Sequence, residues 1–274
     1  MWRQRLKKFI DNPLVIFSFA RNHLYYTFIA DKMSNLYSQK STFISSTETI
    51  ARLTKSDTSL IRVGDGTFGY LLGSSIYFND WHFRYNRDFA KKLEAVMKVA
   101  QDENILFCFP HTLILKSKQG FADAGITNEW RIWVSAKVIL AKYIRNNKTY
   151  GDSLCFHPRY NPNIDFTALK SYLNTKHVII ITSNISRFKS IHLGLSTSFV
   201  EAPSSDTWQV YKKLEEQTLA IIKKNNWLPK DVLIMTSTAE AAKVIVYDLT
   251  KAGYTTWDTG QFFDLASKEI ENIL

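Results

Sequence analysis

A carboxylate set between two glycines is the first place where the sequence indicates chemistry. Asp65 lies in the run Arg62-Val63-Gly64-Asp65-Gly66-Thr67, directly after a short apolar stretch. Flanking glycines tolerate unusual φ and ψ angles and let the backbone come close to a ligand. Asp65 could bind a divalent cation, and Arg62 could form a forked pair with a phosphate. The run therefore predicts a site that neutralises a diphosphate, with an ordinary Asp-Gly turn as the alternative.

Two other acids stand next to predicted strands, where a catalytic group could lie. Asp258 lies in the run Trp257-Asp258-Thr259-Gly260, and Asp152 follows Tyr150-Gly151. Either carboxylate could act as a general base. Asp258 could equally cap the turn that follows it, so the sequence leaves its role open.

Polar and cationic side chains after other predicted strands could reach the same crevice. Three of them are Arg187, His157 and Arg159. The polar run at residues 236–238 precedes a predicted helix, whose N-terminal N–H groups could hold a phosphate. However, Ser237 and Glu240 have the spacing of a capping box, which explains them without a ligand and is the interpretation that we favour.

Several common catalytic patterns do not occur in the sequence. It contains no HxxxH, HExxH, P-loop or GxSxG run, and no nucleophile and base that spacing would pair. Cys108 and Cys155 lie in apolar surroundings without CxxC spacing. We expect both to be buried thiols in a reducing compartment.

Short apolar runs alternate with amphipathic stretches, which predicts an α/β fold with a mostly parallel sheet flanked by helices. Residues 177–182 form a continuous β-branched run, typical of a strand buried on both faces. The expected strands are 59–63, 105–109, 153–156, 177–182, 198–201, 232–235 and one within 253–261. The expected helices are 47–53, 88–101, 129–146, 165–173, 208–225 and 239–252. In such sheets, ligands bind beyond the carboxyl ends of the strands.

The charge balance favours an anionic partner. Thirty-five Lys and Arg residues against 25 Asp and Glu give a formal net charge of +10. Nucleic acid is the least supported partner, because the basic residues are spread along the chain without a nucleic-acid-binding motif. We expect the aromatic run at residues 77–85 to pack within the fold, with stacking on a sugar as the alternative.

The N-terminus is basic and aromatic, but it is neither a signal peptide nor a membrane span. Asp11 and Pro13 interrupt it, and no stretch approaches the roughly 20 apolar residues that a span needs. We therefore expect a cytoplasmic protein. The segment could lie on an anionic membrane surface at the inner face of the cell membrane, or pack on the domain with solvated lysines. We divide the chain into a helical segment at 1–46 and one domain at 47–274.

Five segments in order resemble the GT-D glycosyltransferase family, also catalogued as DUF1792. Residues 59–68 resemble its R-F-G-D-G-E segment, and residues 150–152 resemble its Y-G-(N/D) segment. Residues 177–187 are similar to its strand and T-R pair, and residues 201–211 to its P-x-x-N-A-F-x-x-Y stretch. The closest match is residues 242–260, which resemble A-K-V-L-A-Y-D-L followed by G-Y and D-x-G.

The resemblance implies a GT-D-like nucleotide-sugar-binding fold and transfer of a hexose from a nucleotide diphosphate sugar, often UDP-linked. The acceptor would be a glycan, during assembly of bacterial surface polysaccharide or glycoprotein. The family's D-x-E motif, associated with a metal ion and the diphosphate, falls on Asp65-Gly66-Thr67, so Asp65 is the expected ligand of Mn²⁺ or Mg²⁺. The donor would contact Arg62, Gly64, Asp65, Gly66, Thr67 and Arg187, and the catalytic candidates are Asp65, Asp258 and Asp152.

The sequence departs from the family pattern at the metal motif. Thr67 stands where the family has glutamate, and a hydroxyl is a poor substitute for a carboxylate on Mn²⁺ or Mg²⁺. If this change removes the metal, Arg62 and Arg187 would have to neutralise the diphosphate. The family's G-P-T-A turn reads Ala239-Glu240-Ala241-Ala242, and its histidine after D-x-G is Gln261.

Two other functions compete with this interpretation. A methyltransferase would use residues 64–69 as a cofactor loop and Asp80 as the acid that holds the ribose, but the intervening helix is too short. A non-catalytic, transferase-like scaffold would use its positive charge to hold a membrane, a partner or an anionic glycan. The sequence leaves open the sugar, the acceptor, the stereochemical course and the oligomeric state.

Overall fold

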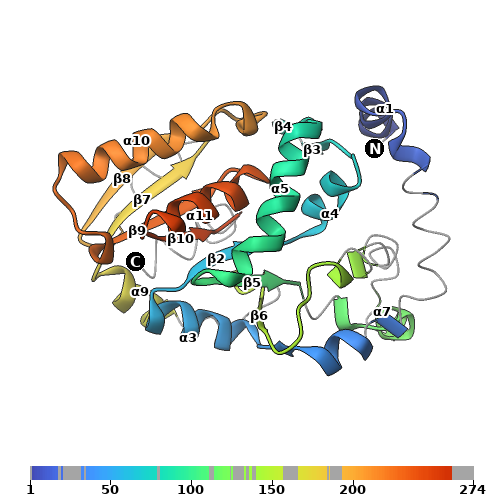
Figure 1. The fold of residues 1–274 in the computed structure, drawn as a ribbon, viewed down its shortest axis with the longest axis horizontal. Coiled ribbons are helices and arrows are strands. Elements are labelled where there is room, and N and C mark those ends of the chain that lie inside the picture. Colours follow the sequence, from blue (N-terminus) through green and yellow to red (C-terminus); the bar gives the residue numbers. More distant parts are fainter. Residues whose placement is uncertain are drawn as a thin grey trace.

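An eight-stranded parallel sheet forms the centre of the protein, with helices on both faces (Figure 1). The structure is a computed structural model that describes residues 2–17, 20, 32–33, 35–78, 81–110, 114–123, 125, 133, 136–137, 140–156, 166–183, 185 and 193–260. From edge to edge the strands are β1 (Thr42–Phe43), β6 (Thr149–Asp152), β5 (Ile105–Phe109), β2 (Ser59–Arg62), β10 (Thr255–Asp258), β9 (Val232–Ser237), β7 (His177–Thr182) and β8 (Ser196–Glu201). Every neighbouring pair is parallel, which confirms the predicted α/β class.

Helices and one small hairpin accompany the sheet. The α-helices are α1 (Trp2–Asp11), α3 (Ser46–Ser56), α4 (Asp65–Leu71), α5 (Arg87–Val99), α7 (Lys118–Asp123), α9 (Phe166–Leu173), α10 (Tyr211–Lys224) and α11 (Ala241–Lys251). Three short 3-10 helices are η1 (Ala100–Asp102), η3 (Thr207–Gln209) and η4 (Pro229–Asp231). Strands β3 (Ile76–Phe78) and β4 (Trp81–Phe83) pair antiparallel, apart from the main sheet.

The sheet separates two apolar clusters, because successive residues of a strand point to opposite faces. Leu60 of β2 joins the cluster that includes Leu53 of α3. Its neighbour Ile61 joins the cluster that includes Leu93 of α5 and Val244 of α11. Burial on both faces explains why the central strands read as continuous apolar runs in the sequence.

Local capping agrees with the predicted helix near residue 47. Ser45 accepts a hydrogen bond from the backbone N–H of Glu48, and the Glu48 carboxylate accepts one from the backbone N–H of Ser45. This reciprocal pair satisfies two donors that the first turn of α3 would otherwise leave free. Of the predicted helix at 129–146, the described residues 133, 136–137 and 140–141 are helical, and the rest falls outside the described residues or beyond the helix end.

Two predicted elements near the carboxyl edge are wrong in their limits. The predicted turn at residues 64–66 is the start of helix α4, with Gly64 as its N-cap residue. The strand predicted at 153–156 is a turn, and the strand there is β6, which ends at Asp152. A carboxylate oxygen of Asp152 accepts a hydrogen bond from the backbone N–H of Leu154 at 3.0 Å, which favours a turn over an extended chain.

The predicted capping box at Ser237 and Glu240 is also wrong. The Ser237 hydroxyl donates to the carbonyl of Gly260 at 2.6 Å instead of capping α11. Ala239 has φ of 51°, in the left-handed region, and no side chain caps the helix at Glu240. A contact between distant segments has therefore displaced the local cap that the spacing favours.

The N-terminal segment contributes to the main sheet. Strand β1 lies within residues 1–46 and pairs with β6 at the sheet edge. The boundary predicted at residue 46 falls at the start of α3, and the division into two units stays a prediction. Cys108 and Cys155 are both fully buried, and burial raises the pKa of the Cys155 thiol to about 12. The prediction of buried thiols is confirmed.

Gly151 in β6 provides a test of how closely α3 packs on the sheet. A Cβ atom at this position would lie 2.4 Å from the Cys108 sulfur and 3.0 Å from the Thr49 side chain. We expect Gly151→Ala to lower the free energy of unfolding by about 1–3 kcal/mol, because neither neighbour has room to move. Gly69→Ala is the matched control, since the nearest atom there is 3.9 Å away and alanine favours the helix. Urea denaturation of both variants measures the difference, and equal stability would contradict the close packing.

Candidate functional site

The carboxyl ends of β2 and β10 meet where the chain order of the sheet reverses. From β2 the sheet continues to β5 and β6 on one side, and to β10 and β9 on the other. Crevices for ligands form at such points in parallel sheets. Arg62 ends β2 and Asp258 ends β10, so the structure brings these two predicted residues to neighbouring strand ends.

Arg62 joins the ends of two strands through backbone carbonyls. Its Nε donates to the carbonyl of Ser153 at 2.6 Å, and its Nη1 donates to the carbonyl of Thr259 at 2.6 Å. Gly260 has φ of 52°, and a Cβ atom there would lie 2.4 Å from Arg62 Nη1. The glycine therefore makes room for the guanidinium. Two donors of Arg62 are used within the protein, while its charge and the N–H groups of Nη2 lie at the strand ends.

Asp65 is the exposed member of the site. It is the first residue of α4, and one of its oxygens accepts a hydrogen bond from the Gly66 backbone N–H at 2.9 Å. Lys8 of α1 is its charged neighbour: burial lowers the pKa of Lys8, and the Asp65 carboxylate acts in the opposite direction. A free carboxylate beside a lysine is available to a ligand.

Thr67 is buried, and its hydroxyl group makes two hydrogen bonds. Its hydroxyl accepts a hydrogen bond from the Gly64 backbone N–H at 3.3 Å and forms a hydrogen bond with the Glu240 carboxylate. A Cβ atom on Gly66 would lie 3.1 Å from Glu240 Oε1. The start of α4 therefore packs directly on the start of α11, with Glu240 between them.

A buried lysine links the two acids at this edge. Lys243 Nζ lies 3.2 Å from Asp258 Oδ2 and 3.5 Å from Glu240 Oε2, and all three side chains are at most 8% exposed. Burial alone would lower the pKa of Lys243, but the Asp258 and Glu240 carboxylates outweigh it and raise the pKa. Burial also raises the pKa of Glu240, against the opposing effects of Lys243 and Thr67.

Two carboxylate oxygens of this group retain hydrogen-bonding capacity. Glu240 Oε2 and Asp258 Oδ2 are buried, and neither receives a well-aligned hydrogen bond from a described residue. The Lys243 ammonium is the charged partner of both oxygens, at 3.5 Å and 3.2 Å. Sequence reasoning missed both Lys243 and Glu240. The available signal was a lysine inside the apolar stretch at residues 241–246, which predicts a buried charge.

Asp152 precedes the Ser153 carbonyl that Arg62 binds, and its carboxylate is engaged in local contacts. Its Oδ2 accepts from the Ser46 hydroxyl at 2.8 Å, and its Oδ1 accepts from the Leu154 backbone N–H at 3.0 Å. Asp152 thus joins α3 to the turn after β6. The predicted donor contact Arg187 lies outside the described residues, as do His157, Arg159, Asp80 and Gln261.

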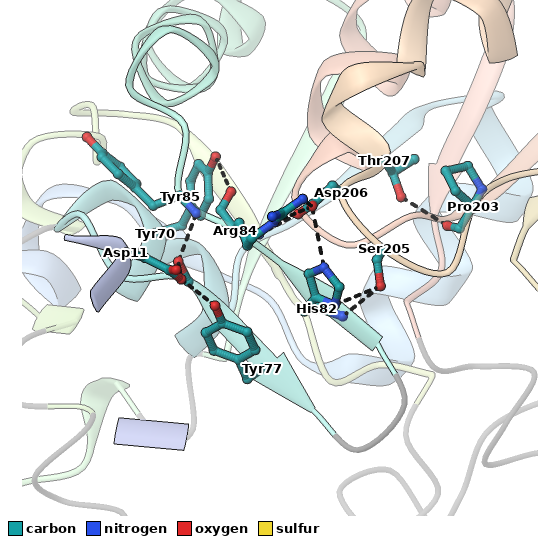
Figure 2. Close-up of polar contacts among 11 residues, drawn as sticks. Asp11, Tyr70, Tyr77, His82, Arg84, Tyr85, Pro203, Ser205, Asp206 and Thr207 are labelled. Carbon is teal, nitrogen blue, oxygen red and sulfur yellow. Dashed lines mark hydrogen bonds and ion pairs between the residues drawn. The ribbon is translucent and has the colours of Figure 1, made fainter. Parts of the chain in front are cut away.

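The hairpin β3–β4 is fastened to the loop between β8 and α10 by Asp206 (Figure 2). This buried carboxylate accepts from the Arg84 backbone N–H at 2.7 Å and Nε at 2.6 Å, and His82 Nε2 lies 3.4 Å away. Burial would raise the pKa of Asp206, but the hydrogen bonds from Arg84 lower it overall. The other ring nitrogen of His82 lies 3.0 Å from Ser205 Oγ. Ser205, His82 and Asp206 are the residue types of a catalytic triad. However, the Asp206 carboxylate is bound by Arg84, so we interpret the cluster as one that holds the hairpin in place.

The described residues do not provide a metal centre of three His, Cys, Asp or Glu side chains. The expected ligand Asp65 stands at the start of α4, where Thr67 is already engaged. The nearest second carboxylate, Glu240, is paired with Lys243. Hard divalent cations prefer several oxygen ligands with negative charge, so this set fits Mn²⁺ or Mg²⁺ poorly.

A family model described as "Glycosyltransferase GT-D fold" matches residues 60–264, which is most of the chain. No curated protein sequence matches this chain. The similarity spans both strand ends of the candidate site and the buried group around Lys243.

Solved structures with a similar fold include three of the domain of unknown function 1792. A selenomethionine-substituted structure of this domain has a TM-score of 0.68 at 21% identity, over 90% of this chain and 86% of that one. A structure described as having a distinct glycosyltransferase fold has a TM-score of 0.66 at 21% identity, over 88% and 84%. A structure described as a new glycosyltransferase from Streptococcus sanguinis has a TM-score of 0.62 at 18% identity, over 85% of each chain.

Removal of the buried lysine tests the ionic group at the strand ends. We expect Lys243→Met to lower the free energy of unfolding by about 3–5 kcal/mol near pH 7, because two buried carboxylates lose their cation. The loss should shrink as pH falls toward the ordinary Glu pKa of 4.5, since Glu240, whose pKa is raised by burial, then binds protons in the folded state at a higher pH than in the unfolded chain.

Urea denaturation near pH 7 and near pH 5 measures both effects. Lys251→Met is the control on the same helix, because that lysine is 54% exposed and its pairing with Glu103 is worth at most about 1 kcal/mol. Equal destabilisation by the two variants, or a loss independent of pH, would show that Lys243 does not hold the two acids.

Proposed function

This chain belongs to the GT-D glycosyltransferase family, and on that premise we propose that it transfers a hexose from a UDP-linked sugar to a glycan acceptor. The acceptor would be part of a bacterial surface polysaccharide or glycoprotein. The observation that carries the proposal is the group of Arg62, Lys243 and Asp258 at the carboxyl ends of β2 and β10. It stands where a parallel sheet binds its ligand, and it combines the Arg62 guanidinium with a buried ion pair.

The proposed donor site neutralises the diphosphate with the chain's own cations. As the bond to the anomeric carbon breaks, the sugar gains oxocarbenium character and the diphosphate gains negative charge. Arg62 offers the N–H groups of Nη2, and Lys8 lies near the start of α4. Gly64 leaves the backbone of this segment accessible to the phosphates, since a Cβ atom there would meet nothing within 4 Å. Asp65 would contact the donor through its free oxygen or through a cation, and Arg187 remains a further proposed contact.

Asp258 is the better supported of the two proposed general bases. Its carboxylate ends β10, on the strand next to the one that Arg62 ends, whereas the two oxygens of Asp152 accept hydrogen bonds from Ser46 and Leu154. The ion pair with Lys243 fixes the position of the Asp258 carboxylate, which could accept a proton from the acceptor hydroxyl. Lys243 itself acts as a positioning residue through Asp258.

We propose that a metal ion contributes little to donor binding. Asp65 is the one carboxylate of the D-G-T turn, and the neighbouring Glu240 is neutralised by Lys243. Arg62 and Lys8 supply positive charge that a cation would otherwise bring. Mn²⁺ or Mg²⁺ would be bound by Asp65 alone among the described carboxylates of the site.

A non-catalytic scaffold is the second candidate function, because Thr67 replaces a glutamate and is buried against Glu240. A protein that had lost catalysis could retain the fold and bind an anionic partner. The two candidates differ in whether a nucleotide diphosphate binds.

Calorimetric titration with UDP, in Mn²⁺ and in chelator, tests the proposal. We expect binding in both conditions with similar affinity, and an affinity about tenfold lower for Arg62→Gln, because charge-assisted hydrogen bonds to phosphate are lost. Arg52→Gln is the matched control, since Arg52 is exposed on α3. Melting curves of each variant check that the fold is retained.

Each contrary result has a definite meaning. Absence of UDP binding up to millimolar concentration would contradict the transferase proposal and favour the scaffold function. Equal binding by Arg62→Gln would limit Arg62 to joining the strands. UDP binding only in the presence of Mn²⁺ would show that a metal ion neutralises the diphosphate, contrary to the proposed role of Arg62 and Lys8.

A further inference from the structure

Helix α1 packs on the protein through its charged side. Asp11 accepts hydrogen bonds from the hydroxyls of Ser75 and Tyr77 (Figure 2), and Asn12 Nδ2 donates to the carbonyl of Gly73 at 3.0 Å. Lys7 Nζ lies 5.6 Å from the centre of the Tyr77 ring. The only acid of the first eleven residues is therefore turned inward, onto the β3–β4 hairpin.

Most of the described apolar side chains of residues 7–17 are exposed. Nine large apolar residues of the described chain are exposed, and five of them fall within residues 9–17. These five form what we call the N-terminal apolar patch: Phe9 (41% exposed), Ile10 (68%), Leu14 (69%), Ile16 (52%) and Phe17 (72%). Val15 is the buried residue among them, at 4%.

This orientation is the reverse of what a helix in a globular protein normally adopts. Such a helix turns its apolar side to the core and its charged side to water. In α1, Phe9 and Ile10 are exposed, whereas the contacts with the hairpin come from Lys7 and Asp11. A concentration of exposed apolar residues of this size indicates a surface that is covered by a partner.

The charge of the segment identifies the kind of partner. Residues 1–10 contain four cations, at Arg3, Arg5, Lys7 and Lys8, and no acid. The segment is thus basic as well as apolar; among its described side chains Lys7 is exposed, whereas Lys8 is partly buried near Asp65. Helices of this composition bind in the interface of anionic bilayers, with the apolar side among the acyl chains and the cations at the headgroups. Among the described residues no helix is long and apolar enough to cross a bilayer, so the contact would be at the surface.

We propose that residues 2–17 are a membrane-surface anchor that inserts the N-terminal apolar patch into an anionic lipid bilayer. The proposal does not depend on the proposed catalytic function. Because α1 lies beside α4 and the β3–β4 hairpin, and Lys8 lies near Asp65, the docked anchor holds the start of α4 next to the lipid surface (Figure 1).

Vesicle sedimentation with the full chain tests the anchor. The vesicles are pure phosphatidylcholine, or equal parts of phosphatidylcholine and phosphatidylglycerol. We expect sedimentation with the anionic vesicles, weakened by salt, and little with the neutral ones. The double variant Ile10→Ser and Phe17→Ser should bind the anionic vesicles at least about tenfold more weakly, because the inserted apolar area falls.

Leu195→Ser and Leu228→Ser together are the matched control, since these leucines are 61% and 56% exposed but lie far from the patch in sequence. The control should bind like the unchanged protein, and melting curves check the fold of both variants. Equal binding by the two double variants, or absence of salt-sensitive binding to anionic vesicles, overturns the proposal. Light scattering tests the alternative that a second copy of the chain covers the patch. If the unchanged protein is a dimer that does not bind vesicles, and the Ile10 and Phe17 variant is a monomer, the patch is a protein interface.

Discussion

The ion pairs of one buried lysine hold together the elements that form the candidate site. Lys243 on α11 reaches Asp258 at the end of β10 and Glu240 at the start of its own helix. Glu240 in turn contacts Thr67 and lies against Gly66, so the position of α4 depends on the same charges. Arg62 adds the link from β2 to the ends of β6 and β10. Because buried charges are costly unless paired, each of these side chains fixes the others.

This constraint also determines what the site can do chemically. A carboxylate that is neutralised by a neighbouring lysine is a weak metal ligand, whereas a guanidinium at a strand end can still bind phosphate. Thr67 occupies the place of the family's glutamate, and Glu240 approaches it from another part of the chain. The carboxylate is thus present near the motif but belongs to an ion pair. A transferase of this family that relies on its own cations is consistent with that arrangement.

Most of the sheet could be predicted from repetitive apolar patterns in the sequence. Contacts between residues that are distant in the sequence could not be predicted. The β-branched run at 177–182 forms β7 with the predicted limits, because burial on both faces leaves one interpretation. The strand predicted at 153–156 failed because Asp152 initiates a turn. Ser237 and Glu240 had the spacing of a cap, but Gly260 and Lys243 are their partners in the fold. Asp65, Arg62 and Asp258 could be found from glycines and strand ends, while Glu240 required knowledge of how α11 meets α4.

The position of the diphosphate in a crystal structure of the protein with UDP and chelator decides whether the strand ends form the donor site. We predict the diphosphate at the carboxyl ends of β2 and β10, in contact with Arg62 and beside the Lys243, Asp258 and Glu240 group. The backbone at Gly64, the N-cap residue of α4, should face the phosphates. Diphosphate bound elsewhere on the protein, or bound at Asp65 only after Mn²⁺ is added, would contradict the claim that this buried ionic group forms the donor site.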